Sequence, residues 1–284
     1  MRSVTEKAWG KLNLTLDVLG IRPDGYHEMQ MIMQSVDLCD DVTIMLTDKN
    51  HWSCCCDCDD VPADRSNLAM KAAESFFARL GSRPDGLEIC IQKRIPMQGG
   101  MAGGSADAAA VLRGLNRFYG GPFSLSELAQ IGAAVGSDVP YCVMGGTMLA
   151  EGRGEVLSPL PAMPDCYYVL VKPNFSVSTP ELFRALDSAE TVLHPDTKRA
   201  IASLKVGDLE SFCTCMHNVF QPVLEQKFPV IADICTTLLS CGALGASLTG
   251  TGSVVYGIFR DESAAQAARD QLQKNFWACI ATNV

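Results

Sequence analysis

The sequence predicts an α+β protein made of two lobes. Its 284 residues are more than one compact core usually holds, which suits two fused lobes with a cleft between them. Stretches that alternate apolar and polar residues are mixed with stretches of helical spacing in both lobes, an order that is compatible with this class but could not produce it alone. A proline-rich passage at 159–164 separates a first lobe over 1–157 from a second lobe over 158–284.

In the first lobe, strands are predicted where apolar residues recur at every second position, and helices where they recur every three or four. Leu12, Leu14 and Leu16 show the first pattern and predict a strand with one buried face. The predicted strands cover 8–19, 42–46 and 87–91, and the predicted helices cover 67–80, 105–118 and 126–136. Arg-Pro-Asp-Gly at 22–25 is typical of a turn, and Gly81 is placed to end the first helix.

The second lobe is predicted to open with a strand at 167–171. Helices over 208–220 and 227–240 precede a Gly/Thr-rich stretch at 249–252. A strand at 254–259 and a helix at 263–275 follow, and the chain shows no internal repeat of fixed period.

The composition favours an intracellular protein and argues against several partners. A net charge of −9 disfavours a nucleic-acid partner, although backbone amides and a few lysines can still attract an anionic substrate into a cleft. No apolar run reaches the roughly 20 residues that cross a bilayer, and no apolar stretch of a signal peptide follows the N-terminal charges. We therefore expect a cytoplasmic protein with no membrane partner, either a monomer or a weak homodimer.

The 13 cysteines are expected to be reduced. Their number is odd, and most of them, such as Cys90 and Cys235, stand alone among apolar residues, as small buried side chains do. A cluster of four cysteines at 54–58, with His51 nearby, resembles a zinc site only superficially, because it lacks a second, separated pair of ligands. We interpret the cluster as a solvent-exposed loop between strands.

A glycine-rich stretch between a predicted strand and a predicted helix has the properties of a phosphate-binding loop. It reads Pro-Met-Gln-Gly-Gly-Met-Ala-Gly-Gly-Ser-Ala-Asp over 96–107. Glycines let backbone N–H groups approach a phosphate closely, and the N-terminus of the following helix attracts anions. Ser105 and Asp107 suit the first turn of that helix, where either could cap it or face a phosphate or a magnesium ion.

The loop alone does not decide the function. No Lys-Ser/Thr follows its last glycine, so it is not a Walker A loop. The stretch also lacks the combined pattern of strand, tight turn and acidic residue that marks a dinucleotide-binding motif, and its spacing disfavours an NAD-dependent oxidoreductase. Because Gly-Gly pairs are more often flexible turns, the interpretation depends on the residues around the loop.

Three stretches together resemble the three sequence motifs of the GHMP kinases, in chain order. They are Lys-Leu-Asn-Leu at 11–14, the glycine-rich stretch at 96–109, and Leu-Thr-Gly-Thr-Gly-Ser at 248–253. Each is weak evidence by itself, whereas three in order are specific. The resemblance implies transfer of phosphate from ATP to an alcohol. It also implies a two-lobed fold, with a ribosomal-protein-S5-like N-terminal domain and a ferredoxin-like C-terminal domain.

Further stretches narrow the resemblance to the GHMP kinases of the non-mevalonate isoprenoid route, which phosphorylate the 2-hydroxyl of a cytidyl diphosphate substrate. They include Arg-Pro-Asp-Gly-Tyr-His-Glu at 22–28, Gly-Ser-Asp-Val-Pro at 136–140 and Val-Ser-Thr-Pro-Glu-Leu-Phe at 177–183. One departure is Trp9-Gly10, where the family commonly has Pro-Ala, and we expect it to loosen the entry to the strand. The cysteine-rich stretch is also unlike the family.

The resemblance implies catalytic roles for two residues. Asp138 would be the general base that removes the proton of the accepting hydroxyl, and Lys11 would be its cationic partner. On spacing alone, Asp138 is more simply explained as a turn residue and Lys11 as a solvated strand residue; the three motifs together reverse that preference. The phosphates of ATP, bridged by Mg²⁺ without dedicated protein ligands, would lie on Pro96, Gly99, Gly100, Gly103, Gly104 and Ser105.

The resemblance also implies a set of substrate-binding residues, since a cytosine ring requires stacking partners and polar groups for its edge. They are Asn13, Tyr26, His27 and Phe183. Without the resemblance, core packing and a turn hydrogen bond would explain the aromatic residues and the histidine. The third motif would supply a supporting turn made of Thr249, Gly250, Thr251 and Gly252. Two alternatives stay open: a GHMP kinase for homoserine or a mevalonate derivative, and a catalytically silent nucleotide-binding relative.

Overall fold

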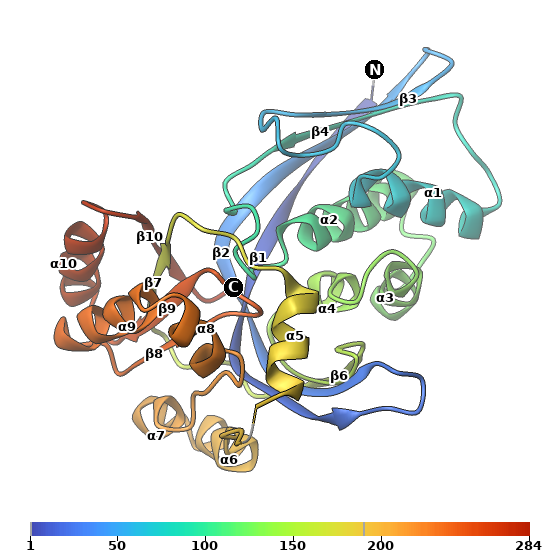
Figure 1. The fold of residues 1–284 in the computed structure, drawn as a ribbon. Coiled ribbons are helices and arrows are strands. Elements are labelled where there is room, and N and C mark those ends of the chain that lie inside the picture. The colour runs from blue at the N-terminus through green and yellow to red at the C-terminus, as the bar shows by residue number, and fades with distance from the viewer. Residues whose placement is uncertain (1, 190) are drawn as a thin grey trace. The chain divides into compact units, whose positions relative to one another are not determined.

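The computed structural model describes residues 2–189 and 191–284, and the chain forms two compact units. Unit 1 contains residues 2–10, Leu38–Ile95 and Ala102–Gly145; unit 2 contains Lys11–Asp37, Pro96–Met101 and Gly146–Val284. Both units combine strands with helices (Figure 1), which confirms the α+β class. The lobe boundary expected near residue 157 stays a prediction. Within the described residues, every helix is too short or too polar to cross a membrane.

Two long strands contribute residues to both units. β1 (Arg2–Ile21) and β2 (His27–Thr47) contain the predicted strands 8–19 and 42–46 and extend beyond them. Residues 10–17 of β1 are buried on both faces, although the alternation predicts only one buried face. The second face carries polar side chains. Burying polar side chains costs free energy unless they have partners, so this stretch of β1 is a candidate part of a functional site.

The turn predicted at 22–25 joins β1 to β2. The amide of Arg22 donates to the carbonyl of Tyr26 at 2.7 Å, and Gly25 has a φ of 83°. Glycine adopts that left-handed conformation without steric cost, which explains its place here.

Unit 1 combines its portion of the sheet with four helices. The strand beside β2 is β4 (Gly86–Gln92), β3 (Trp52–Cys56) lies parallel to β4 at the edge, and the helices are α1 (Leu68–Leu80), α2 (Gly103–Phe118), α3 (Leu125–Ala133) and α4 (Val139–Met144). α1 begins and ends as predicted: Asn67 accepts the amide of Ala69 at 2.8 Å, and Gly81 ends the helix with a φ of 75°. α2 lies close to β2, because a Cβ at Gly114 would be 2.5 Å from the Ile44 side chain.

Unit 2 contains a four-stranded antiparallel sheet in the order β10-β7-β9-β8. In chain order the pattern is strand, helices, strand, strand, helix, strand, which confirms the ferredoxin-like expectation. The strands are β7 (Tyr167–Lys172), β8 (Gly245–Leu248), β9 (Val255–Phe259) and β10 (Trp277–Thr282), and β5 (Thr147–Gly152) and β6 (Val156–Pro159) extend the unit 2 part of β2. The helices are α5 (Thr179–Asp187), α6 (Thr197–Val206), α7 (Leu209–Cys213), α8 (Gln221–Lys227), α9 (Val230–Ser240) and α10 (Glu262–Leu272).

The single helix predicted over 208–220 is wrong. The chain forms α7 and then a break before α8, and Asn218 lies in the break. The side-chain amide of Asn218 donates to the carbonyls of Leu248 and Gly250, and its oxygen accepts the amide of Phe220. The first two bonds satisfy carbonyls of the turn around 248–250, and the third holds the residue just before α8. A continuous helix would not place the side chain to make them.

The solvent-exposed loop expected at 54–58 is also wrong. Residues 52–56 form β3, whose alternation buries Cys54 and exposes Cys55. Cys55 forms a disulfide with Cys90, so the expectation that every cysteine is reduced fails for this pair. Contiguous thiols obscure the period-two pattern of an edge strand, because cysteine is tolerated on either face.

Candidate active site

The first half of the glycine-rich stretch, Pro96–Met101, belongs to unit 2 and packs tightly on the third motif. Gly100 has a φ of 76°, and a Cβ at this position would collide with the carbonyl oxygen of Thr249. The amide of Val254 donates to the carbonyl of Gly99 at 3.1 Å. The loop and the turn at 249–252 are therefore joined by backbone contacts that leave no room for a side chain.

Lys11 lies where all three motifs meet in unit 2. Its side chain is 4% exposed, and Nζ donates to the carbonyl of Gly100 at 2.7 Å and to Oδ1 of Asn13 at 2.5 Å. A Cβ at Gly250 would lie 3.3 Å from the same Nζ. The Lys11 amino group, buried among oxygen partners, therefore lies against the glycine-rich loop.

Asn13 and Thr249 complete this arrangement. The backbone amide of Asn13 donates to Oγ1 of Thr249 at 3.0 Å, and that hydroxyl lies 3.4 Å from the carbonyl of Gly100. Next along the third motif, the hydroxyls of Thr251 and Thr179 are 3.0 Å apart. The third motif therefore supports the first two through side-chain hydroxyls as well as through its glycines.

The second half of the glycine-rich stretch, in unit 1, begins α2 without a side-chain cap. Ala102 is the N-cap residue, has a φ of 56° and makes no side-chain hydrogen bond to the helix. Gly104 is exposed and Ser105 half-buried. The first amides of a helix have no partner within the helix, so an uncapped start can bind an anion such as a phosphate.

The residues of the loop that have a left-handed backbone are not all glycines. Gly100 is left-handed, but so are Gln98 and Ala102, whereas Gly103 and Gly104 have ordinary helical backbone. A left-handed backbone costs a non-glycine residue roughly 1–2 kcal/mol. The two non-glycine residues hold strained conformations on either side of the turn, a feature often found at ligand sites.

A buried group of three charges holds the end of the segment before the loop and the first turns of α2 together within unit 1. Nζ of Lys93 lies 2.5 Å from Asp40 and 2.8 Å from Asp107, and all three side chains are almost fully buried. Oδ1 of Asp40 also accepts the amides of Arg94 and Ile95, the residues that lead into Pro96. The group thereby fixes the chain just before the loop and the first turns of α2 just after it.

The charge balance of this group is unusual. Burial raises the pKa of the Asp107 carboxyl to about 7, with the nearby Asp40 charge adding to the effect and Lys93 opposing it. Burial alone would lower the pKa of Lys93, but the two carboxylates outweigh it and raise that pKa. Oδ1 of Asp107 has no hydrogen-bond partner in the part of the chain that the structure describes. Oδ2 of Asp107 is therefore engaged with Lys93 inside unit 1, and a contact of Asp107 with a phosphate or Mg²⁺ stays a prediction.

Asp138 is the residue before α4 and lies close to the start of α2. Its carbonyl accepts the amide of Cys142 at 3.0 Å, while its side chain makes no capping bond. A Cβ at Gly136 would be 3.9 Å from Oγ of Ser105, so the 136–138 turn runs beside the first turn of α2. A half-buried carboxylate here is not needed to cap the helix that follows.

Three of the predicted substrate residues lie at two aromatic contacts of unit 2. The rings of His27 and Phe183 have centroids 4.4 Å apart, and Nε2 of His27 is 2.9 Å from Oδ1 of Asp187. Tyr26 is 56% exposed, and the guanidinium of Arg153 lies 4.3 Å from its ring centroid. Asn13, the fourth, is instead buried beside Lys11.

Comparison with protein families agrees with this geometry. Residues 67–146 match the GHMP kinases N terminal domain, and residues 200–278 match the GHMP kinases C terminal domain. A 4-diphosphocytidyl-2-C-methyl-D-erythritol kinase of Clostridium tetani is 41% identical over 95% of this chain and 96% of that protein. One of Acetivibrio thermocellus is 42% identical over 99% of both chains. The chain belongs to the 4-diphosphocytidyl-2-C-methyl-D-erythritol kinases.

Solved structures agree with this family. The crystal structure of a 4-(cytidine 5'-diphospho)-2C-methyl-D-erythritol kinase is 28% identical to this chain, covers 98% of both and has a TM-score of 0.84. A homoserine kinase from Cytophaga hutchinsonii has a TM-score of 0.80 at 19% identity, covering 100% of this chain and 95% of that one. At that identity the likeness concerns the fold alone, so the GHMP fold is common to kinases of different substrates.

Within this kinase family, the chain's departure at Trp9-Gly10 does not interrupt the strand. β1 continues through both residues, and Gly10 is buried, so the expected loosening is wrong. Sequence reasoning missed Asp40 and Lys93 as parts of the site. The pair Asp40-Asp41 is noticeable in the sequence, but only the fold brings Asp40 to Lys93.

Proposed function

We propose that this chain transfers the γ-phosphate of ATP to the 2-hydroxyl of 4-diphosphocytidyl-2-C-methyl-D-erythritol. The proposal draws on relatives that are 41–42% identical over nearly the whole chain and bear that kinase name. The observation that carries it is the position of Lys11, whose Nζ touches the glycine-rich loop at Gly100 and lies against Gly250. Phosphoryl transfer depends mainly on positioning and on neutralising charge, and a buried cation at the phosphate loop serves both.

ATP would lie with its phosphates on the glycine-rich loop. Support comes from the uncapped start of α2, where the amides of Gly103, Gly104 and Ser105 can donate to phosphate oxygens. The Ser105 hydroxyl could hold Mg²⁺ together with phosphate oxygens and water, since Asp107 is engaged with Lys93. Bound there, the metal ion would neutralise charge on the transferred group.

Asp138 would act as the general base and Lys11 as the cation beside the accepting hydroxyl. The Asp138 side chain is free of any capping role, and its turn runs beside Ser105 in unit 1. In this role the carboxylate accepts the hydroxyl proton as the oxygen attacks the γ-phosphorus. The Lys11 ammonium stabilises the alkoxide character that develops on the attacking oxygen.

The cytosine ring would be recognised by His27, Phe183 and Tyr26. The His27 ring lies against Phe183 in a tilted contact, and Asp187 holds one of its nitrogens. The other nitrogen of the His27 ring would contact the edge of the base. Exposed Tyr26, with Arg153 over its ring, offers a second flat face and a positive charge for the diphosphate. Asn13 would reach the substrate only through its contact with Lys11.

The test is a phosphate-transfer assay on the full chain with ATP, Mg²⁺ and one alcohol at a time. We expect turnover with 4-diphosphocytidyl-2-C-methyl-D-erythritol, a phosphate on its 2-hydroxyl by phosphorus NMR, and little turnover with homoserine or mevalonate. Preferred turnover of homoserine or mevalonate would assign the chain to another GHMP reaction. ATP binding without turnover of any alcohol would instead indicate a silent relative.

A further inference from the structure

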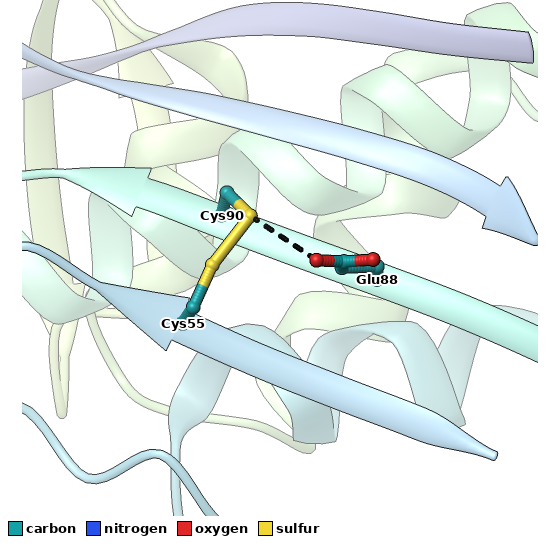
Figure 2. Close-up of side chains that lie close together, drawn as sticks. All are labelled: Cys55, Glu88 and Cys90. Atoms are coloured by element: carbon teal, nitrogen blue, oxygen red, sulfur yellow. Dashed lines mark hydrogen bonds between the residues drawn. A yellow bond between two sulfur atoms is a disulfide. The ribbon is translucent and has the colours of Figure 1, made fainter.

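A group of metal-type ligands lies on unit 1, among residues that the proposed kinase reaction does not use. Cys55 of β3 and Cys90 of β4 are direct partners in the parallel register, with Cα atoms 4.8 Å apart. Glu88 precedes Cys90 by two residues, so it lies on the same face of β4 (Figure 2). The sulfur atoms and a carboxylate oxygen all lie within 4.8 Å of one another.

The surroundings of these three side chains limit the ligands that can take part. Cys54 and Cys56 alternate to the other face of β3, and Cys54 is buried there. Lys49 is the nearby cation, with Nζ 3.8 Å from Glu88 in a pair whose lysine is 61% exposed. Such a surface pair is weak, so it does not prevent Glu88 from binding a metal.

We propose that, once the disulfide is reduced, Cys55, Cys90 and Glu88 bind one thiophilic divalent cation such as Zn²⁺. Two thiolates and one carboxylate fill three positions of a tetrahedral site, and water can fill the fourth because Cys55 is exposed. Two sulfurs on one tetrahedral zinc are about 3.8 Å apart. Rotation of the side chains provides that spacing across a Cα separation of 4.8 Å.

Oxidation and metal binding exclude each other at this site, because both use the same two sulfur atoms. Reduction by a dithiol such as dithiothreitol delivers two electrons and two protons, breaks the S–S bond and leaves two thiols. Each thiol then releases its proton when it binds the metal. The oxidised chain therefore has no vacant thiolate here, and metal affinity should rise with pH.

Both forms of the site link the edge strand β3 to β4. β3 has five residues and pairs only with β4 among the strands of the sheet, so it gains most from a second attachment. A metal that binds the folded chain and not the unfolded one stabilises it in proportion to its occupancy. The inference does not depend on the kinase reaction and would stand if that reaction were wrong.

The experiment is a titration of the reduced, full-length protein with Cd²⁺, whose thiolate complexes absorb in the ultraviolet. We expect the number of bound Cd²⁺ ions to fall by one in Cys55→Ser and Cys90→Ser and to stay unchanged in Cys241→Ser, a half-buried free cysteine of unit 2. Glu88→Gln should weaken this site by roughly tenfold or more. Bound Cd²⁺ should also protect Cys55 and Cys90 from alkylation, as read by mass spectrometry.

Glu88→Gln keeps the test decisive if a cysteine variant unfolds, because it replaces a half-buried side chain by one of nearly equal size and leaves both thiols. Zn²⁺ should raise the melting temperature of the reduced wild-type chain and not that of Cys90→Ser. Equal Cd²⁺ binding by wild-type and Cys55→Ser protein overturns the proposal, as does unchanged affinity in Glu88→Gln together with no protection from alkylation.

Discussion

At Gly100 the chain combines a left-handed backbone with a contact that leaves no space for a side chain. A Cβ there would collide with the Thr249 carbonyl, whereas Gly120, with a nearly equal φ of 79°, has nothing within 4 Å of its Cβ position. The two glycines therefore separate the cost of the backbone conformation from the cost of the collision.

We predict that Gly100→Ala loses far more stability than Gly120→Ala. The second change should cost roughly 1–2 kcal/mol, the steric price of a left-handed alanine. The first should cost at least about 2 kcal/mol more, because the loop must move off the third motif. It should also abolish turnover, since the Gly100 carbonyl holds Lys11. Denaturant unfolding and kcat measure both effects; equal costs in the two variants would contradict the close packing of the motifs.

Asp138→Asn should separate catalysis from folding. We expect kcat to fall by roughly 10²–10⁴ because the amide cannot accept the hydroxyl proton. Stability should change little, because the Asp138 side chain does not cap α4. Steady-state kinetics measure kcat, and calorimetric titration with nucleotide measures whether the variant still binds it. Ser137→Ala, at the neighbouring exposed residue, is the matched control. A near-normal kcat would remove Asp138 from the mechanism.

The aromatic pair His27–Phe183 should control affinity for the cytidyl substrate alone. Removing either ring by alanine should raise KM for that substrate about 10-fold or more, because a base stacked on an aromatic ring gains roughly 1–3 kcal/mol. KM for ATP should hardly change. Phe228→Ala removes a ring from a different stacked pair of unit 2 and serves as the control. Equal changes in both KM values would contradict this placement.

Single residues show what a sequence can and cannot reveal. The motif around Lys11 marks it as a candidate, but only the structure buries it against Gly100 and Asn13. Lys93 has no motif to mark it, and a lone lysine at a strand end is ordinarily solvated. Its role depends on Asp40 and Asp107, which are far from it in sequence, so pairing is visible only in the fold.

At the scale of elements, Lys93, Asp40 and Asp107 connect β4, β2 and α2 around the glycine-rich loop. With both carboxylates ionised the group carries a net charge of −1 in a buried site. Removing the cation leaves two buried carboxylates unpaired, whereas removing one carboxylate leaves a balanced pair. The two changes therefore have very different expected costs.

We predict that Lys93→Met destabilises unit 1 by about 3–5 kcal/mol at pH 8, the cost of leaving buried charges unpaired. Asp107→Asn should cost no more than about 1–2 kcal/mol, because an amide keeps one hydrogen bond to Lys93 and adds no charge. Denaturant unfolding gives both values. A Lys93→Met variant as stable as Asp107→Asn would show that the group does not depend on its cation.

The same group predicts a pH dependence of stability. The pKa of Asp107 in the folded chain, about 7, lies above that of an exposed aspartate, about 3.9. Between these values the folded chain holds a proton that the unfolded chain has released, so this residue lowers stability as pH rises from 4 to 7. Asp107→Asn should reduce the change of folding stability with pH over that range. An unchanged slope of stability against pH would show that other groups cause the dependence.

Elements were predictable where their signals are local. Alternation located β4 and the core parts of β1 and β2, and Asn67 with Gly81 fixed both ends of α1. β3 was missed because its three consecutive cysteines hide the period of two. The helix predicted over 208–220 ran past the end of α7 because the hydrogen bonds that Asn218 makes with 248–250 are not visible in the local sequence. In the second case long-range contacts override the local pattern.

At the scale of the whole molecule, the chain enters and leaves each unit several times. Unit 2 takes Lys11–Asp37 and Pro96–Met101 from the first half of the sequence. The proline-rich passage at 159–164 gave a boundary by composition, but composition cannot show that residues 11–37 belong to the same compact unit as the second half of the chain. The three motifs lie in both halves of the chain, so their order indicated the fold of the whole chain.

This arrangement predicts that residues 158–284 alone do not fold cooperatively. In the full chain the hydroxyl of Tyr256 donates to the carbonyl of Asn13, and the amides of Leu16 and Val219 pair with His217 and Leu16. At the C-terminal end, the Thr282 amide and hydroxyl both donate to Asp37. A fragment without residues 11–37 loses all of these partners.

The expected loss is large compared with the total stability. Each buried hydrogen bond contributes about 1 kcal/mol, and the apolar side chains of residues 12–16 and 29–36 contribute about 1.5–3 kcal/mol each when fully buried. A domain is stable by only about 5–15 kcal/mol, so the fragment should unfold without a sharp transition while the full chain unfolds cooperatively. Calorimetry of both measures this, and adding residues 11–37 to the fragment by a flexible linker is the matched comparison. If 158–284 alone melts as sharply as the linked form, the early strands are not needed and the second lobe is an independent domain.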